Sequence, residues 1–387
     1  MTHQNQSSEV AAVVQLLANE GFKGMANAMQ ILLNEAMKLE RSEYLNAKPY
    51  QRTEDRRSYA NGFKDKTVNS RLGKLALHVP QTRDSEFYPS ALEREERSER
   101  AFKLAIAEMY VQGVSTRKVA KITEELCGTE VTSMQVSRAA AMLDEELEAW
   151  RTRPLSQVEY LMLDARYEKV RVAGSVRDCA VLVAIGVLPT GQRSVLGVSV
   201  SLSEAEVHWR DFLRSLKTRG MQGMKLVISD AHKGLKSARK AVMPSVPWQR
   251  CQFHLMQNAM QYIPKIEMRK QIAQDLRNVF NARDIDDANE ELKRFVSLYK
   301  DSAPNVATWA DKNIPEGLTV FQIPKDHRKR MRTTNMLERQ NKEIKRRTRV
   351  ATLFPNEASL LRLVTAVLVE LSEEWETSNM RYLVFEN

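Results

Sequence analysis

The chain has few cysteines and no long apolar run, and both absences exclude classes of protein. Cys127, Cys179 and Cys251 are an odd number at wide spacing in 387 residues, which argues against a disulfide framework and for free thiols in a reducing compartment. No stretch approaches about 18 uninterrupted apolar residues, and the first residues lack a basic segment followed by an apolar one. We therefore expect a soluble, cytoplasmic protein that is neither secreted nor embedded in a membrane.

Charged residues, by contrast, are abundant. The chain carries 59 Lys and Arg against 49 Asp and Glu, a formal charge of +10, and 43% of its residues are hydrophobic. This composition is typical of a folded protein, and the length allows two or three domains. The positive balance favours an anionic partner such as nucleic acid.

The first 100 residues predict helices followed by a small basic unit. Apolar residues recur at helical spacing through 8–45, so residues 1–46 form a helical region whose apolar faces make a dimer contact or pack on the rest of the chain. Residues 47–100 begin with a basic, turn-rich stretch and lead into alternating residues at 75–79, before Pro80. This pattern predicts a small β unit or an extended basic arm.

Residues 101–150 carry the start and stop signals of a helix-turn-helix unit. Gly113 and Gly128 end two helices, Ser115 is a good N-cap, and Thr132 or Ser133 caps a last helix that runs to residue 143. In such units the last helix lies in the major groove, although a plain helical bundle has the same periodicity. The residues that we expect to contact DNA here are Arg117, Ser133, Gln135, Ser137 and Arg138.

From residue 158 the pattern becomes that of strands. The predicted strands are 158–172, 179–188 and 194–200, which form an antiparallel meander, then 224–229 and 248–251, with helices between the last three. Three strands, helix, strand, helix, strand is the order of ribonuclease H-like folds. We therefore expect an α/β (α+β) fold of this kind for 151–255, a choice that does not by itself give function.

The remainder predicts an all-helical insertion at 256–325 and a second part of the α/β domain at 326–387. That second part contains a basic helix over 331–349 and an amphipathic helix over 357–375. Between 325 and 349 there are 11 Lys and Arg against 3 Asp and Glu, a local balance of +8. Such a segment is suited to follow a polyphosphate backbone.

Three acidic residues are candidates to share divalent cations. Asp164 and Asp230 each follow a strand predicted to be central, where side chains leave a buried sheet, although Asp at a strand end is also a common turn residue. Glu338 lies in the basic helix, and Glu343 is the alternative third acid unless it pairs with Arg339 or Arg347. Three carboxylates around two Mg²⁺ ions suit phosphodiester chemistry.

Cys251-Gln-Phe-His254 is the remaining chemical motif. One Cys-x-x-His pair without a second pair nearby supplies too few ligands for a structural zinc site. By itself, His254 is either a contact to a scissile phosphate or a hydrogen-bonded histidine near a core.

Together these motifs resemble bacterial insertion-sequence transposases of the Mutator type, which carry a DDE catalytic triad. The resemblance covers nearly the whole chain, in order, through 109–117, 163–166, 227–235, 248–254, 334–338 and 344–349. It implies a ribonuclease H-like catalytic domain interrupted by an all-helical insertion. It also implies that Asp164, Asp230 and Glu338 bind Mg²⁺, with Mn²⁺ tolerated, that His254 is catalytic and that Cys251 supports the active site.

The same resemblance implies the reaction and its partners. Double-stranded DNA is cleaved at the terminal inverted repeats of the element, and the freed 3′-hydroxyls attack target DNA, in many relatives through a circular intermediate. We expect a homodimer, associated with the nucleoid when bound to DNA, because two element ends must be held together. Further expected DNA contacts are Arg339, Lys342, Lys345, Arg346, Arg347, Arg349 and Trp309, the last being either a base-stacking or a core residue. A catalytically inactive DNA-binding regulator derived from a transposase is the alternative.

Overall fold

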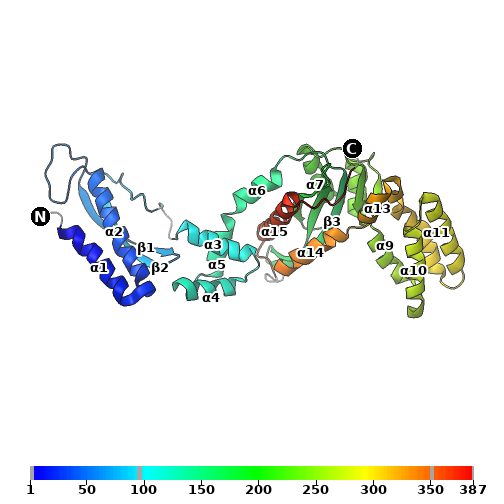
Figure 1. Ribbon diagram of the computed structural model, residues 1–387, viewed down its shortest axis with the longest axis horizontal. Coiled ribbons are helices and arrows are strands. Elements are labelled where there is room, and N and C mark those ends of the chain that lie inside the picture. Colours follow the sequence, from blue (N-terminus) through cyan, green and yellow to red (C-terminus); the bar gives the residue numbers. More distant parts are fainter. Residues whose placement is uncertain (1–3, 93, 95–97, 349–352, 386–387) are drawn as a thin grey trace. The chain divides into compact units, whose positions relative to one another are not determined.

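The computed structural model describes residues 4–92, 94, 98–348 and 353–385, and it divides into the units Met1–Leu143 and Asp144–Asn387 (Figure 1). Each unit has its own hydrophobic core. Among the described residues no helix is both long and apolar enough to span a bilayer.

The N-terminal unit begins with two helices and a β-hairpin. Helices α1 (Gln4–Glu20) and α2 (Met25–Tyr44), joined by the 3₁₀ turn η1 (Gly21–Gly24), confirm the predicted helical region. Strands β1 (Ala60–Ser70) and β2 (Gly73–Thr82) pair antiparallel, and α2 packs on β2. The β unit is thus confirmed, but Pro80 lies inside β2 rather than ending it. In a two-stranded hairpin each strand has an unpaired edge, where a missing N–H costs little.

Three helices complete this unit: α3 (Arg100–Val111), α4 (Thr116–Cys127) and α5 (Ser133–Ala141). The predicted caps are confirmed, because Ser115 Oγ accepts from the Lys118 N–H, Thr132 forms a capping box with Gln135, and Gly128 has a φ of +60°. The last helix ends at Ala141 rather than at residue 143. The three helices share a core around Ile106, Val119 and Val136.

Helix α6 (Asp144–Thr152) belongs to the C-terminal unit. Arg362 donates to both oxygens of the Asp144 carboxylate at 2.6 and 2.7 Å, and Arg151 Nη1 donates to Thr365 Oγ1 at 3.1 Å. The boundary between the units therefore precedes this helix, whereas the sequence pattern placed it at residue 150.

The C-terminal unit is built on a five-stranded mixed sheet. Its strands are β3 (Tyr160–Val172), β4 (Ser175–Val187), β5 (Arg193–Ser201), β6 (Leu226–Ser229) and β7 (Trp248–Arg250). The spatial order is β5-β4-β3-β6-β7. The first three strands form the predicted antiparallel meander, and β6 and β7 add in parallel.

Helices cover both faces of this sheet. Helices α7 (Glu206–Thr218) and α8 (Lys233–Val242) bury one face, with Trp209 packed among Leu161 and Leu182. The alternate residues Val181 and Val183 are buried too, so a second layer must cover the other face. Helix α15 (Glu357–Thr377) packs along β5 and β3 there. Its middle turns are buried on almost every side, which corrects the prediction of an amphipathic helix.

Between β7 and α15 the regular elements of the described chain are all helices. The elements are α9 (Gln252–Ala259), η2 (Met260–Tyr262), η3 (Ile266–Met268), α10 (Arg269–Phe280), α11 (Ile285–Tyr299), α12 (Pro304–Asn313), η4 (Ile314–Gly317), η5 (Thr319–Gln322), α13 (Lys325–Met331) and α14 (Asn335–Thr348). The basic segment is two helices, so the predicted start at residue 331 is wrong. Between α13 and α14 the backbone forms a hydrogen bond with a distant part of the chain in place of a helical one, because the Gln252 N–H donates to the carbonyl of Arg332 at 2.9 Å.

Candidate active site

Asp164 and Asp230 meet where two parallel strands separate. The pairing of β3 with β6 ends at Met162 and Ile228, and Asp230 comes directly after β6. Asp164 lies inside β3, which continues to Val172 against β4, so the expectation of a strand end is corrected for this residue. Beyond this point β6 no longer pairs with β3, so the Asp164 side chain lies close to Asp230 where the two strands separate.

The Asp164 carboxyl is buried, with 9% exposed. Burial and the nearby charge of Asp230 raise its pKa to about 7, against the opposing charge of His254 and a hydrogen bond from Asn341 Nδ2 to Asp164 Oδ2 at 2.7 Å. A carboxyl group whose ionisation is opposed by burial and by a neighbouring carboxylate would be stabilised in its charged form by a bound cation.

A buried acid that the sequence pattern did not single out, Glu204, helps to position Asp230. The backbone N–H of His232 donates to Asp230 Oδ1 at 3.1 Å, and His232 Nδ1 lies 3.4 Å from Glu204 Oε2. Burial raises the pKa of Glu204, and the charge of Asp230 adds to the effect, while His232 opposes it. A Cβ at Gly234 would lie 2.2 Å from the carbonyl oxygen of Glu204, so only glycine permits this close approach. In the sequence, Gly234 within the segment 227–235 was the one feature that could have pointed to this close contact.

Cys251 and His254 connect this site to the start of α14. The Cys251 thiol is fully buried, and its Sγ accepts from both the N–H and the Oγ1 of Thr334 at 3.3 Å, one residue before α14. A hydrogen bond with Cys251, together with the charges of Asp164 and Asp230, raises the pKa of His254 to about 9. This shift favours the protonated imidazole beside the two acids. Burial opposes ionisation of the Cys251 thiol, but His254 and Thr334 together lower its pKa.

Helix α14 is fixed along β3 by polar contacts. Besides the Asn341–Asp164 bond, Arg166 Nη1 donates to the carbonyl of Asn341, and Thr348 Oγ1 donates to Glu168 Oε1 at 3.1 Å. Glu338 is one turn before Asn341 on this helix, but its side chain and that of Arg339 lie outside the described part, as does the whole of Arg349. Among the described side chains no three His, Cys, Asp or Glu residues form a metal-binding group.

Glu343, the alternative third acid, is engaged elsewhere. It binds Arg346 at 2.7 Å and Arg347 at 3.0 Å, and these bonds, that with Arg346 first, lower its pKa to about 2. The predicted pair with Arg347 is confirmed. Arg347 is only 8% exposed and also binds Glu370 at 2.5 Å, which corrects its assignment as a DNA contact. Lys342, Lys345 and Arg346 are exposed on the same helix.

The expected DNA contacts of the N-terminal unit are all exposed, but two of them also stabilise the fold. Ser133 Oγ donates to Thr116 Oγ1 at 3.3 Å, and Gln135 Oε1 accepts from the Thr132 N–H at 2.8 Å. Arg117, Ser137 and Arg138 are the other three. In the inserted helices, Trp309 is half-buried and stacks on Tyr262 with ring centroids 5.6 Å apart, so it is not a core residue.

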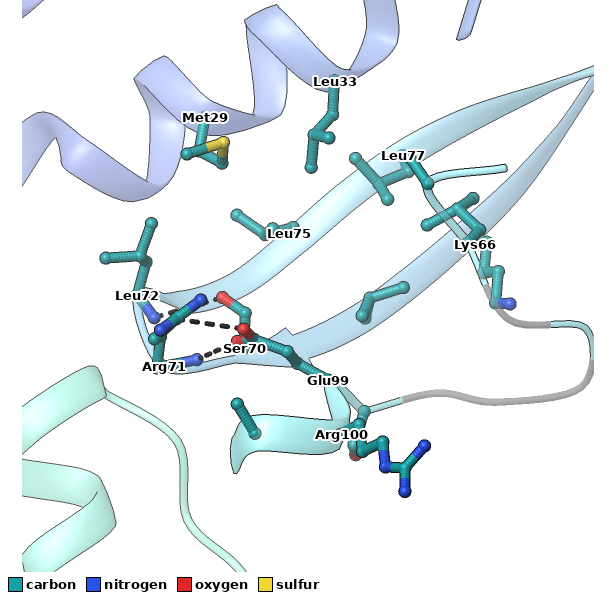
Figure 2. A pocket seen from close by; sticks show the side chains of 15 residues that line it. Met29, Leu33, Lys66, Ser70, Arg71, Leu72, Leu75, Leu77, Glu99 and Arg100 are labelled. Carbon is teal, nitrogen blue, oxygen red and sulfur yellow. Dashed lines mark hydrogen bonds and ion pairs between the residues drawn. The ribbon is translucent and has the colours of Figure 1, made fainter. Parts of the chain in front are cut away.

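A pocket of about 440 Å³ in the N-terminal unit offers no comparable chemistry (Figure 2). Met29 and Leu33 of α2 face Leu75 and Leu77 of β2 across it. At its rim, Arg71 Nε and Glu99 Oε1 form an ion pair at 3.0 Å. The described residues that line it include neither His nor Cys.

A mixed α/β domain that brings two acids and a cationic histidine beside a basic helix suits an enzyme that acts on phosphodiesters. The family model described as "Transposase, Mutator family" matches residues 1–378. The chain is 54% identical to the transposase for insertion sequence element IS406 of Burkholderia multivorans, over 100% of both chains. It is 42% identical to that of ISRM5 of Rhizobium meliloti (99% and 96% covered) and 37% identical to that of IS256 in transposon Tn4001 of Staphylococcus aureus (98% of both). The chain belongs to the Mutator family of transposases.

Proposed function

We propose that this chain cleaves the terminal inverted repeats of its own insertion sequence and joins the freed 3′ ends to target DNA, with Asp164, Asp230 and Glu338 as a DDE triad. The observation that carries the proposal is the meeting of Asp164 and Asp230 where β3 and β6 separate, each near the other in a buried site. The sheet order β5-β4-β3-β6-β7, with a helical insertion after β7, supports a ribonuclease H-like catalytic domain.

The side chains present fit Mg²⁺. Asp164 and Asp230 supply hard oxygen ligands whose mutual repulsion a cation relieves, and Glu338 lies on the helix that Asn341 ties to Asp164. Bound ions would activate the attacking hydroxyl and stabilise the leaving oxygen, and Mn²⁺ would substitute. The pairing of Glu343 with two arginines favours Glu338 over Glu343 as the third ligand.

The protein's own groups orient these ligands before DNA binds. Asn341 holds one oxygen of Asp164, and the His232 N–H holds one oxygen of Asp230, so neither carboxylate must be ordered during the reaction. The raised pKa of His254 favours a protonated imidazole beside both acids, and this charge would help to neutralise a phosphate. Helices α4 and α5 would read the repeats through Arg117, Ser137 and Arg138, in a homodimer that holds two element ends.

The test compares wild type with Asp164→Asn, Asp230→Asn and Glu338→Gln on a labelled duplex that carries the element's end, in Mg²⁺. We expect each variant to lose cleavage and joining by about 1000-fold, or ~4 kcal/mol of barrier, while binding the duplex as wild type does. Glu343→Gln is the matched control on the same helix and should retain most activity.

The same assay separates the alternative. If wild type binds the end duplex but does not cut it in Mg²⁺ or Mn²⁺, the triad is wrong and the chain is a DNA-binding regulator that has kept the family's fold. If Glu343→Gln and not Glu338→Gln abolishes cleavage, the third ligand has been misassigned.

A further inference from the structure

A groove of about 1020 Å³ lies on the side of α14 that faces α15. Its walls come from α13, α14, the end of α15 and the segment 378–382. Asn341 of α14 contacts Asp164, whereas Lys342, Glu343 and Arg346 of the same helix line the groove. The candidate active site and the groove therefore lie on different faces of α14, and an α-helix with its side chains is about 10 Å in diameter.

The groove is basic, and its charges divide into paired and unpaired ones. Six Lys and Arg line it against three Glu, a balance of +3. The buried floor is neutralised, because Arg347 binds Glu343 and Glu370. At the rim, Lys342 and Arg381 are exposed and form no ion pair within the described residues, and the exposed Arg330 guanidinium lies 5.0 Å from the ring centroid of Tyr382. Long, exposed cations around a neutral floor are suited to phosphates along a backbone.

The wall that carries Arg381 is part of the fold. The N–H groups of Tyr382 and Leu383 both donate to the carbonyl of Gly191, at 2.8 and 3.1 Å, and a Cβ at Gly191 would lie 1.9 Å from the Leu383 carbonyl oxygen. The Arg193 guanidinium lies 4.2 Å from the ring centroid of Trp375 and 5.0 Å from that of Tyr382. The rim cations therefore project from ordered supports, so that less freedom is lost when they bind a ligand.

We propose that this groove binds the sugar–phosphate backbone of the element-end duplex whose scissile phosphate lies at the acids, through Lys342, Arg330 and Arg381. This inference rests on the proposed function. A duplex with one phosphate at Asp164 extends beyond that phosphate on both sides, and the adjacent groove offers exposed positive charge from Lys342 of α14, Arg330 of α13 and Arg381. The contact is with phosphates, so it adds affinity without sequence preference.

The experiment measures binding of the end duplex as a function of salt, without divalent metal, for Lys342→Ala/Arg381→Ala. The matched control is Arg214→Ala/Lys240→Ala, which removes the same charge from α7 and α8 on the other face of the sheet. We expect the slope of log affinity against log salt to fall by about 2 for the groove variant, with about tenfold weaker binding, and to stay unchanged for the control. Equal melting temperatures check that both variants fold.

Two results would overturn the proposal. If the groove variant matches the control both in its slope and in joining pre-cut ends to a plasmid, the groove does not contact DNA. An unchanged slope for end binding, combined with a loss of joining to a plasmid from pre-cut ends, would assign the groove to target DNA instead. A third result separates this proposal from the proposed function. If the groove variant lowers the slope as expected but wild type never cuts the duplex, the proposed function is refuted and the groove assignment stands.

Discussion

The charged form of Asp164 is destabilised in the folded protein, because burial and the charge of Asp230 both oppose its ionisation. Its pKa is raised to about 7, so in the metal-free protein the folded state keeps a proton that the unfolded state releases above pH ~4. Stability should therefore fall as pH rises from ~4 to ~7 and then level off. We expect Asp164→Asn to stabilise the metal-free protein at pH 8, by up to about 4 kcal/mol, and to have little effect at pH 4.

Thermal unfolding in EDTA at the two pH values checks this prediction. The control is Asp178→Asn, which changes an exposed aspartate of β4 in the same sheet and should leave the melting temperature unchanged at both. If Asp164→Asn instead destabilises the protein at pH 8, then the protein alone stabilises the Asp164 carboxylate. The argument for a cation at this site would then lose its main support.

At the scale of elements, the start of α14 is set by one thiol. Cys251 accepts two bonds from Thr334, which is fully buried, and its interaction with His254 is the largest cause of that residue's raised pKa. Cys251→Ala leaves the Thr334 donors buried without an acceptor, at a cost of about 2 kcal/mol. It should also lower the pKa of His254 from about 9 toward its ordinary value, so a contribution of the charged imidazole to cleavage would persist at pH 6 and be lost at pH 8.

Titration of the histidine ring signals by NMR measures this shift, with His254→Gln identifying the resonance. Cys251→Ser is the matched variant, because its hydroxyl can still accept from Thr334 and should recover most of the stability. If the His254 pKa is the same in wild type and Cys251→Ala, then Asp164 and Asp230 and not the thiol hold the imidazole cationic.

These same elements show what sequence can and cannot predict. The caps at Ser115, Thr132 and Gly128 were predictable because each depends on residues within one turn. The break before α14 was not, since the bonds that replace the helix come from Cys251 and Gln252, some 80 positions earlier in the chain. Likewise, sequence named Asp164 and a long strand, 158–172, that contains it, but not the point at which the neighbouring strand β6 stops pairing with β3. Nor did it reveal Glu204, a lone acid whose role depends on a contact with His232.

At the scale of the whole molecule, the N-terminal helices keep apolar surface that their own unit does not cover. In α1, Val10 and Val14 are 57% and 61% exposed one turn apart, and Phe22 is 92% exposed just beyond the helix. The homodimer proposed above to hold two element ends offers an occupant for this surface, namely a second copy of the chain. We expect Val10→Glu/Val14→Glu to weaken self-association by at least about tenfold, since each change places a charge in an apolar contact.

Sedimentation at several protein concentrations gives the dimer constant directly. Gln15→Glu/Asn19→Glu, which adds two charges at exposed positions on another face of the same helix, should leave that constant near the wild-type value. End-duplex cleavage measured alongside separates two roles of the contact. If the valine variant is monomeric yet cuts single ends normally and fails only to join paired ends, α1 acts in bringing the ends together. If the valine variant stays dimeric, the two copies associate through another surface, and the exposed valines of α1 do not form the dimer contact.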